Sequence, residues 1–323
     1  MRDTILFGDC RQTLKEFDEK ARMCVTSPPY YGLRDYGGEN DQIGQEQTPE
    51  EFIEQLVNVF KEVRNVLTDD GTCWVNLGDS YYNYRPGKGQ GLAKQTVSNT
   101  KQDLPDVCPR RGNRLEGLKE KDLIGIPWMF AFAMRADGWY LRQDIIWHKP
   151  NPMPESVKDR CTKSHEYIFL FSKNKKYFYD NESIKEPAKD WGTRDRSKGK
   201  YHNEGTGLQP HSGLTKSYPT KNKRSVWSVT NKPYREAHFA TYPPDLIEPC
   251  ILAGSEKGDI VLDPFMGSGT TAAVAKSLGR DYIGCELHEK YGDLIRQRVS
   301  EYHVPIEEVS QNGLTDLLDS AIL

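Results

Sequence analysis

Apolar and polar positions alternate along the chain with two different periods, which predicts strands and helices in turn. Strands are expected at 4–9, 21–29 and 72–82, and helices at 11–17 and 48–71. The longer helix opens with Thr48 as a candidate N-cap before Pro49, and Leu56, Phe60 and Val63 fall on one of its faces. Such an alternation of strand and helix is typical of an α/β protein.

Two aperiodic regions interrupt this alternation. Residues 82–121 are rich in Gly, Lys, Arg and Pro, and we expect them to form a long mobile loop. Beyond it the pattern predicts a helix at 122–138, two strands at 139–150 and 165–174 that can pair, an aperiodic stretch at 185–235, and helices and strands again over 242–302.

Composition narrows the class of protein. The 323 residues suffice for one large α/β domain with an insertion or for two domains, and 36% hydrophobic with 28% charged residues fits a soluble chain. No segment has the length of a membrane span and the N-terminus has no signal-peptide pattern, so a cytoplasmic location is expected. The seven cysteines are scattered without a Cys-x-x-Cys pair, which indicates reduced thiols and no metal site.

Charge is distributed unevenly. The net charge is −3, but residues 185–235 hold twelve Lys or Arg against four Asp or Glu, with Trp191, Tyr201, Tyr218 and Trp227 among them. Composition alone slightly favours a solvated linker, and a nucleic-acid surface, for which basic residues interleaved with aromatic ones are typical, is the alternative.

The first chemical motif is the end of the second strand, "VTSPPYYG". The paired Pro28 and Pro29 fix two φ angles and remove two backbone donors, so the carbonyl groups here are held rigidly. Ser27 and Tyr30 flank them. A hydroxyl, a stiff carbonyl and an aromatic ring are therefore expected together at one strand end, although a strand-ending turn with an aromatic plug is the simpler interpretation of the motif taken alone.

The second motif is "DIVLDPFMGSGTTAAVAKSLGRDYIGCEL". A buried strand ends at Asp263, a glycine-rich turn opens a helix, and the next strand ends at Glu286, which predicts a site for a cofactor that contains a nucleoside. The turn lacks the lysine of a P-loop, and Ala272 stands where a dinucleotide site has its third glycine. Asp263 would repel a phosphate but could pair with a cationic amino group, so S-adenosylmethionine fits best.

Together, "TSPPY" and "DPFMGSGTT" make the chain resemble the amino-group DNA methyltransferases. The resemblance implies a Rossmann-like α/β fold with a seven-stranded, mostly parallel sheet, circularly permuted so that the catalytic segment comes first. It further implies a catalytic half at 1–180, an inserted target recognition region at 181–236 and a cofactor-binding half at 237–323. The expected cofactor residues are Asp9, Asp263, Phe265, Gly267, Ser268, Gly269, Thr270, Thr271 and Glu286.

Catalysis is expected at Ser27, Pro28, Pro29 and Tyr30. The Ser27 hydroxyl and the Pro28 carbonyl would each accept one N–H of an exocyclic amine, and Tyr30 would stack on the extruded base. Serine at the first motif position is common among the N4-cytosine enzymes of this family, so transfer to N4 of cytosine is favoured over N6 of adenine. A catalytically silent nucleic-acid-binding module is the alternative from another class.

Partners and secondary candidates complete the expectations. Double-stranded DNA is the expected partner, no membrane is involved, the chain is expected to be a monomer or homodimer, and a cognate restriction endonuclease is a candidate partner. Asp9 also suits a helix N-cap, and Asp79 is open to the same two interpretations, a cofactor contact or a structural role. His148 and Lys149 could contact phosphate, although a surface position at a strand end is the default expectation for both. Cys250, in a predicted helix, is expected to be a packing residue.

Overall fold

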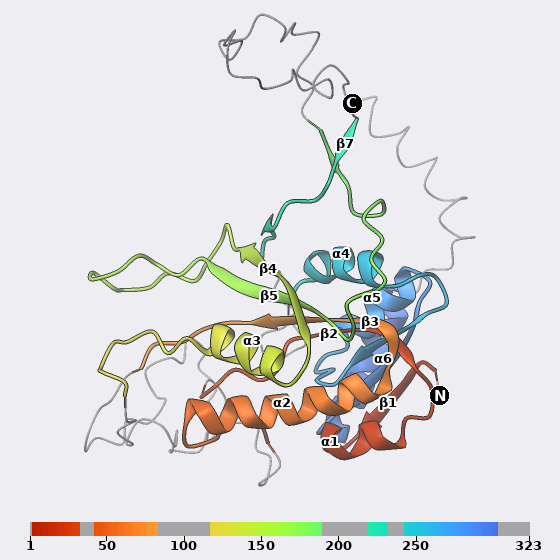
Figure 1. The fold of residues 1–323 in the computed structure, drawn as a ribbon, viewed down its shortest axis with the longest axis horizontal. Coiled ribbons are helices and arrows are strands. Elements are labelled where there is room, and N and C mark those ends of the chain that lie inside the picture. The colour runs from red at the N-terminus through yellow and green to blue at the C-terminus, as the bar shows by residue number, and fades with distance from the viewer. Residues whose placement is uncertain (1, 33–41, 83–116, 189–218, 232–241, 303–323) are drawn as a thin grey trace, which may run out of the picture.

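The computed structural model describes residues 2–32, 42–82, 117–188, 219–231 and 242–302 (Figure 1). Their centre is a sheet with the strand order β1-β10-β9-β2-β3-β5-β4-β8. The strands are β1 Thr4–Phe7, β2 Ala21–Thr26, β3 Leu67–Leu77, β4 Tyr140–His148, β5 His165–Ser172, β8 Val226–Ser228, β9 Ile260–Asp263 and β10 Asp281–Glu286. Strands β1, β10, β9, β2 and β3 are parallel, and β5 runs antiparallel to both β3 and β4. The predicted α/β class with a mostly parallel sheet is confirmed.

The sheet has one more strand than expected. Residues Val226–Ser228 form β8, which pairs in parallel with the end of β4. The strand lies inside the basic stretch and is only three residues long, so its sequence shows no periodicity. Trp227 explains why it pairs, since its side chain is buried and its Nε1 donates to the carbonyl of Arg224 at 2.7 Å.

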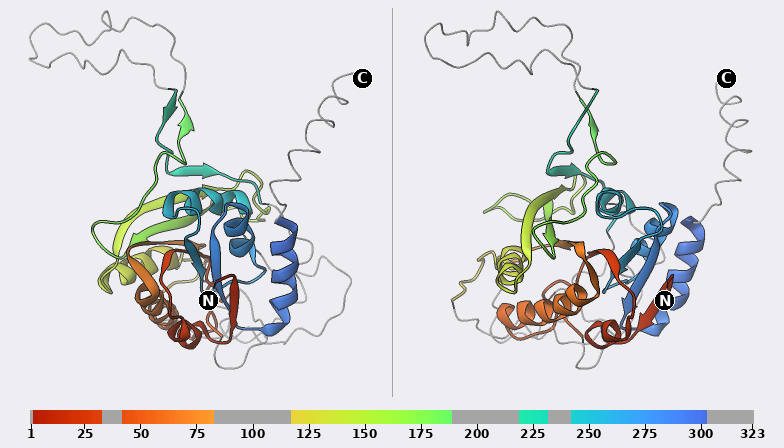
Figure 2. Two further views of the ribbon diagram at one scale, coloured as in Figure 1. Left: turned by 90° about the vertical axis from the view of Figure 1, so that its right-hand side faces the viewer. Right: turned by 45° about the vertical axis from the view of Figure 1, so that its right-hand side comes forward.

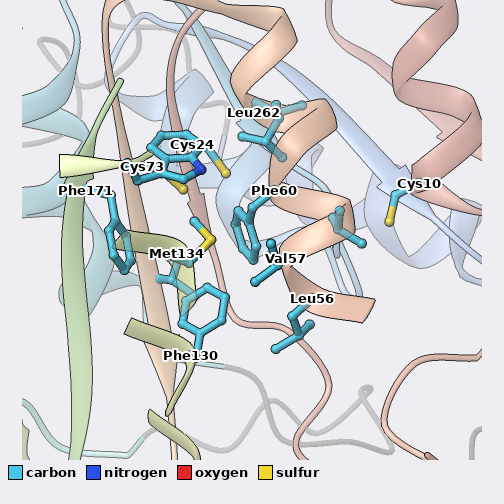
Figure 3. Close-up of a cluster of buried hydrophobic side chains, with 14 of the residues drawn as sticks. Cys10, Cys24, Leu56, Val57, Phe60, Cys73, Phe130, Met134, Phe171 and Leu262 are labelled. Atoms are coloured by element: carbon cyan, nitrogen blue, oxygen red, sulfur yellow. The ribbon is translucent and has the colours of Figure 1, made fainter. Parts of the chain in front are cut away.

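Helices cover both faces of the sheet (Figure 1). The helices are α1 Cys10–Thr13, α2 Pro49–Val66, α3 Ile126–Ala136, α4 Pro244–Gly254, α5 Thr270–Ser277 and α6 Gly292–Tyr302, with 3-10 turns η1 Leu14–Glu16 and η4 Glu289–Tyr291. Side chains of α1, α2 and α3 share one core cluster, and those of α4, α5 and α6 share the other. In Figure 3, Phe60 of α2 and Phe130 of α3 belong to one cluster with Cys24 and Cys73 of the sheet.

A small ribbon stands apart from the main sheet. Strands β6 Glu186–Pro187 and β7 Thr220–Lys221 pair antiparallel, and β7 lies away from the large sheet in every view (Figures 1 and 2). Most of the basic stretch and most of the predicted loop at 82–121 lie outside the described residues. No helix in the described ranges is long and apolar enough to cross a membrane.

The strand order brings the two predicted motifs together. Strand β2, which leads into Ser27, lies directly beside β9, which ends at Asp263. Strand β9 in turn pairs with β10, which ends at Glu286, and β10 pairs with β1, which precedes Asp9. Because these strands are parallel, all four carboxyl ends lie at one edge of the sheet, where ligands bind in open α/β sheets.

Helix α2 packs on one face of this sheet, and its start is set by a capping box. The Thr48 hydroxyl accepts from the amide of Glu51 at 3.2 Å, and the Glu51 carboxylate accepts from the amide of Thr48 at 3.2 Å. We expect Thr48→Ala to lower the free energy of unfolding by about 1 kcal/mol because the helix loses this acceptor. Thr48→Ser, which keeps the hydroxyl, should cost much less. Urea unfolding measures both, and equal midpoints for wild type and Thr48→Ala would contradict the capping role.

Candidate functional site

Asp263 lies at the centre of the predicted site and is 1% exposed. Its Oδ1 accepts from the Thr26 hydroxyl at 2.6 Å and from the Phe265 amide at 2.9 Å. Its Oδ2 lies 2.5 Å from the Thr271 hydroxyl and 3.1 Å from the Tyr242 hydroxyl, and because these two hydroxyls also contact each other, one of their two protons joins them and the other goes to Asp263. Burial raises the pKa of this carboxyl, while the hydrogen bonds act in the opposite direction.

These contacts bear on the role predicted for Asp263. Both carboxylate oxygens already accept hydrogen bonds inside the protein. Direct pairing with the cofactor stays a prediction. What the structure shows is that Asp263 joins the strand before Ser27 to the first turn of α5. Tyr242 was missed because no motif marks it, and the prolines that follow it were the only local signal.

The glycine-rich turn between β9 and α5 is held on three sides. Gly269, at φ 83°, begins α5, and a Cβ there would lie 2.9 Å from the Cγ2 of Ile295. The buried Ser268 hydroxyl accepts from Nη1 of Arg298, also buried, at 2.5 Å. Thr270 is buried beside Thr271 at the start of the helix. The turn therefore keeps its backbone close to α6, as a turn built for close approach requires.

Glu286, at the end of β10, closes the other side of this turn. Its Oε2 accepts from the Gly267 amide at 2.9 Å and its Oε1 from the His288 amide at 3.1 Å. The residue is 9% exposed, and burial raises the pKa of its carboxyl to about 7. The structure thus places the acid directly against the turn, where the sequence predicted it, while its contact with ribose hydroxyls stays a prediction.

The second motif lies at the neighbouring strand end. The Ser27 hydroxyl donates to Oδ1 of Asn76 at 3.3 Å, and the Tyr30 hydroxyl donates to Oε2 of Glu166 at 2.7 Å. A Cβ at Gly78 would lie 2.6 Å from Cε2 of Tyr30, so the ring rests against the backbone at that glycine. Pro28 is buried and Pro29 half-buried. Asn76 and Glu166 were missed because they lie inside the predicted strands, where periodicity marks packing and not contacts with a distant loop.

Asp9, Asp79 and Cys250 each have a structural role. Asp9 caps α1 through the Arg11 amide at 2.8 Å, which confirms the N-cap, while its predicted contact with adenine stays a prediction. Asp79 accepts from the amides of Gly125 and Ile126 at 3.0 and 3.1 Å, at the start of α3. Cys250 is buried within α4, as expected of a packing residue.

Lys149 does not stand free at the surface as its strand-end default implied. Its side chain is 17% exposed, forms an ion pair with Glu166, and lies over the ring of Trp147 at 4.1 Å. His148 Nδ1 lies 3.0 Å from the hydroxyl of Ser228. In the part of the chain that the structure describes, no three His, Cys, Asp or Glu side chains are arranged to hold a metal ion.

Comparisons with known proteins point to one family. Residues 21–297 match the family model described as DNA methylase. The type II methyltransferase M.SmaI of Serratia marcescens is 46% identical over 91% of this chain and 90% of its own length. M.Cfr9I of Citrobacter freundii is 44% identical over 92% and 87%.

Solved structures show the same fold. The PvuII cytosine-N4-specific DNA methyltransferase superposes with a TM-score of 0.61 at 18% identity, covering 96% of this chain and 90% of that one. TTHA0409 of Thermus thermophilus, complexed with S-adenosyl-L-methionine, gives a TM-score of 0.55 at 23% identity and covers 94% of both chains.

The raised pKa of Glu286 predicts a pH dependence of stability. Between pH 4.5, the ordinary value for a glutamate, and about 7, the folded state holds a proton on this carboxyl that the unfolded state has lost. The free energy of unfolding should therefore fall as pH rises through this window, by on the order of 3 kcal/mol.

Denaturation of the cofactor-free protein across this pH range measures the effect. Glu286→Gln should remove this part of the slope, whereas Glu54→Gln, at an exposed position of α2, should leave it in place. A Glu286→Gln profile parallel to that of the wild type would show that burial does not raise the pKa of this carboxyl.

Proposed function

Because the chain belongs to the DNA methylase family, we propose that it is a site-specific DNA methyltransferase that acts on N4 of cytosine. The observation that carries this is the meeting of two strand ends. Ser27 follows β2, Asp263 ends the adjacent β9, and the Thr26 hydroxyl bonds to the Asp263 carboxylate. An acceptor for an amine thus lies beside the turn that the family uses for its cofactor.

S-adenosylmethionine is the cofactor of this family, and the residues present fit it. The glycine turn permits close backbone approach, and Glu286 presents a carboxyl beside Gly267 to which ribose hydroxyls can donate. We propose that Asp9 and Phe265 line the same site and that Asp263 keeps the glycine-rich turn in its conformation through hydrogen bonds. When bound, the cofactor supplies an electrophilic methyl group, its sulfonium leaving as a neutral thioether while the amine nitrogen gives up one proton to solvent.

The chain's own part in the reaction is to make the amine nucleophilic. An exocyclic amine is a poor nucleophile because its lone pair is delocalised into the ring. If Ser27 Oγ and the Pro28 carbonyl each accept one N–H, the nitrogen moves toward a tetrahedral geometry with its lone pair directed at the methyl group. The prolines hold the carbonyl still, and Tyr30, with its ring fixed against Gly78, offers a surface on which an extruded base can stack.

Cytosine is preferred over adenine because of Ser27. A neutral hydroxyl can accept from either amine, so the preference rests on the residue that this family uses with each base, and N6 of adenine is the alternative. The PvuII enzyme bears the name cytosine-N4-specific, but its 18% identity relates it to this chain by fold alone.

DNA contacts are proposed for the inserted region at 181–236. Its described part carries Lys221, Lys223 and Arg224 next to the β6–β7 ribbon, which extends away from the large sheet (Figure 2). Residues 1–180 and 237–323 would then form the two halves of one methyltransferase domain. This arrangement would let the ribbon reach along a duplex while the sheet edge receives one base.

The wider setting follows from the relatives, several of which are named type II methyltransferases. We propose that the chain protects DNA in a restriction-modification system, with a restriction endonuclease of the same specificity as its counterpart. The proposal includes a cytoplasmic location, since the substrate is DNA, and a monomer or homodimer as the active form.

The experiment is methyl transfer from labelled S-adenosylmethionine to duplex DNA, with nucleosides identified by mass spectrometry. N4-methylcytosine is the expected product, and N6-methyladenine alone would overturn the choice of base. Ser27→Ala should lower kcat by about 100-fold or more while its affinity for the cofactor, measured by calorimetry, is unchanged. Ser300→Ala, at an exposed position of α6, is the matched control. Folded wild type that binds DNA without transfer would support a silent binding module instead.

The basic insertion predicts a salt dependence. Replacing Lys221, Lys223 and Arg224 with alanine should weaken DNA binding and flatten the slope of log K against log salt, by roughly 0.9 for each phosphate that is no longer neutralised. Lys15→Ala/Lys61→Ala/Lys119→Ala, at exposed positions outside the insertion, controls for net charge. An unchanged slope in the insertion variant would mean that these residues do not contact DNA.

A further inference from the structure

A polar cluster that no motif marks lies against the catalytic strand end. Asn76 of β3 is 4% exposed and contacts Ser27, Tyr30 and Glu166. Glu166 belongs to β5, and its partner Lys149 follows β4. Three strands therefore contribute to a cluster that contacts the proposed catalytic motif at the hydroxyls of Ser27 and Tyr30.

The contacts of Asn76 fix which way its amide points. One side of the amide faces Oε2 of Glu166 at 3.2 Å and the carbonyl oxygen of Tyr167 at 3.1 Å. A carboxylate and a backbone carbonyl only accept hydrogen bonds, so this side must be the Nδ2 donor. Oδ1 of Asn76 then points at the hydroxyls of Ser27 and Tyr30, at 3.3 and 3.2 Å.

Each of these hydroxyls has one proton, and the distances assign both. The Tyr30 hydroxyl lies 2.7 Å from the carboxylate of Glu166 and 3.2 Å from the amide oxygen of Asn76, so its proton goes to the charged and closer acceptor. Oδ1 of Asn76 is left to the proton of Ser27. With its proton committed to Asn76, the Ser27 oxygen keeps its lone pairs for donors from the other side.

Glu166 is itself held in place. Its Oε1 forms an ion pair with Lys149, and the two side chains are 14% and 17% exposed. The ammonium group balances the carboxylate charge at a position that is largely out of water, which makes a half-buried acid tolerable there. Glu166 can therefore serve as the fixed acceptor that orients both Asn76 and Tyr30.

We propose that Asn76 is a positioning residue that makes Ser27 an acceptor for the exocyclic amine of the target base. This inference rests on the proposed methyl transfer to an amino group. Without Asn76, the Ser27 proton can turn toward the base, and the hydroxyl then competes with the amine as a donor. Asn76 is buried behind Ser27, so its loss should change kcat more than binding.

The first test is Asn76→Ala. We expect kcat for DNA methylation to fall by about 100-fold, as for a misplaced catalytic group, with the KM for DNA and the calorimetric affinity for S-adenosylmethionine within threefold of wild type. Asn65→Ala, at an exposed position of α2, is the control. An unchanged kcat would overturn the proposal, and so would equal losses in kcat and cofactor affinity, because these indicate a general structural role.

The second test is Asn76→Asp, which keeps the shape and separates positioning from packing. Two carboxylates would then lie side by side, which raises the pKa of the pair. When the pair holds a proton, the new group donates to Glu166 and accepts from Ser27, as the amide did. Because the new carboxyl accepts from Ser27 in either protonation state, the kcat of this variant at pH 6, where the pair holds a proton, should exceed that of Asn76→Ala by about tenfold or more.

Asn65→Asp introduces the same charge on α2 and should follow the wild-type pH profile. An Asn76→Asp variant no faster at pH 6 than Asn76→Ala would overturn the proposal, and Asn76→Leu, which keeps the shape without an acceptor, replaces Asn76→Ala if circular dichroism shows that variant to be unfolded. Methyl transfer by the wild type tests the proposed function separately. If the wild type transfers methyl groups to DNA and both Asn76 variants match it, only the positioning role fails.

Discussion

The buried carboxylate of Asp263 is the constraint on which the site depends. A charge removed from water is costly unless hydrogen bonds replace the lost hydration, and here the Thr26 hydroxyl, the Phe265 amide and the paired hydroxyls of Thr271 and Tyr242 do so. These groups come from the end of β2, from the turn, from the first turn of α5 and from the residue ahead of α4. Losing one of them would leave the carboxylate underpaired, so the strand before Ser27 and the glycine-rich turn are held in one arrangement by a single side chain.

This constraint also explains how segments far apart in the sequence form one site. Thr26 and Asp263 are 237 positions apart, yet β2 and β9 are neighbours in the sheet. Their parallel pairing places both carboxyl ends at the same edge, and the Thr26–Asp263 bond fixes their relative height. The ends of β10 and β1 extend the same edge, so Glu286 bonds to the turn and Asp9 follows the next strand along.

Sequence predicted the parts whose signals are local. The α/β class, the N-cap of α2 and the turn after β9 follow from periodicity, a capping box and glycine spacing. Strand β8 could not be predicted because three residues carry no period, and its pairing depends on burying Trp227. Tyr242, Asn76 and Glu166 were also missed, since each acts through a partner distant in sequence. Lys149 was predicted at the surface because the ion pair with Glu166 forms only after β4 and β5 pair.

Carboxyl groups contact the glycine-rich turn directly, but they do not contact Ser27 directly. At Asp263 and Glu286 carboxyl groups face the glycine-rich turn, where backbone amides and hydroxyls donate to them. Ser27 is instead contacted by the neutral amide of Asn76. The carboxylate of Glu166 bonds to the other side of that amide and forms an ion pair with Lys149. A charge directly against Ser27 would strengthen the hydrogen bond but would also have to be desolvated beside an apolar base. An amide oriented by a distant ion pair fixes the hydroxyl proton without placing that charge in the reacting region.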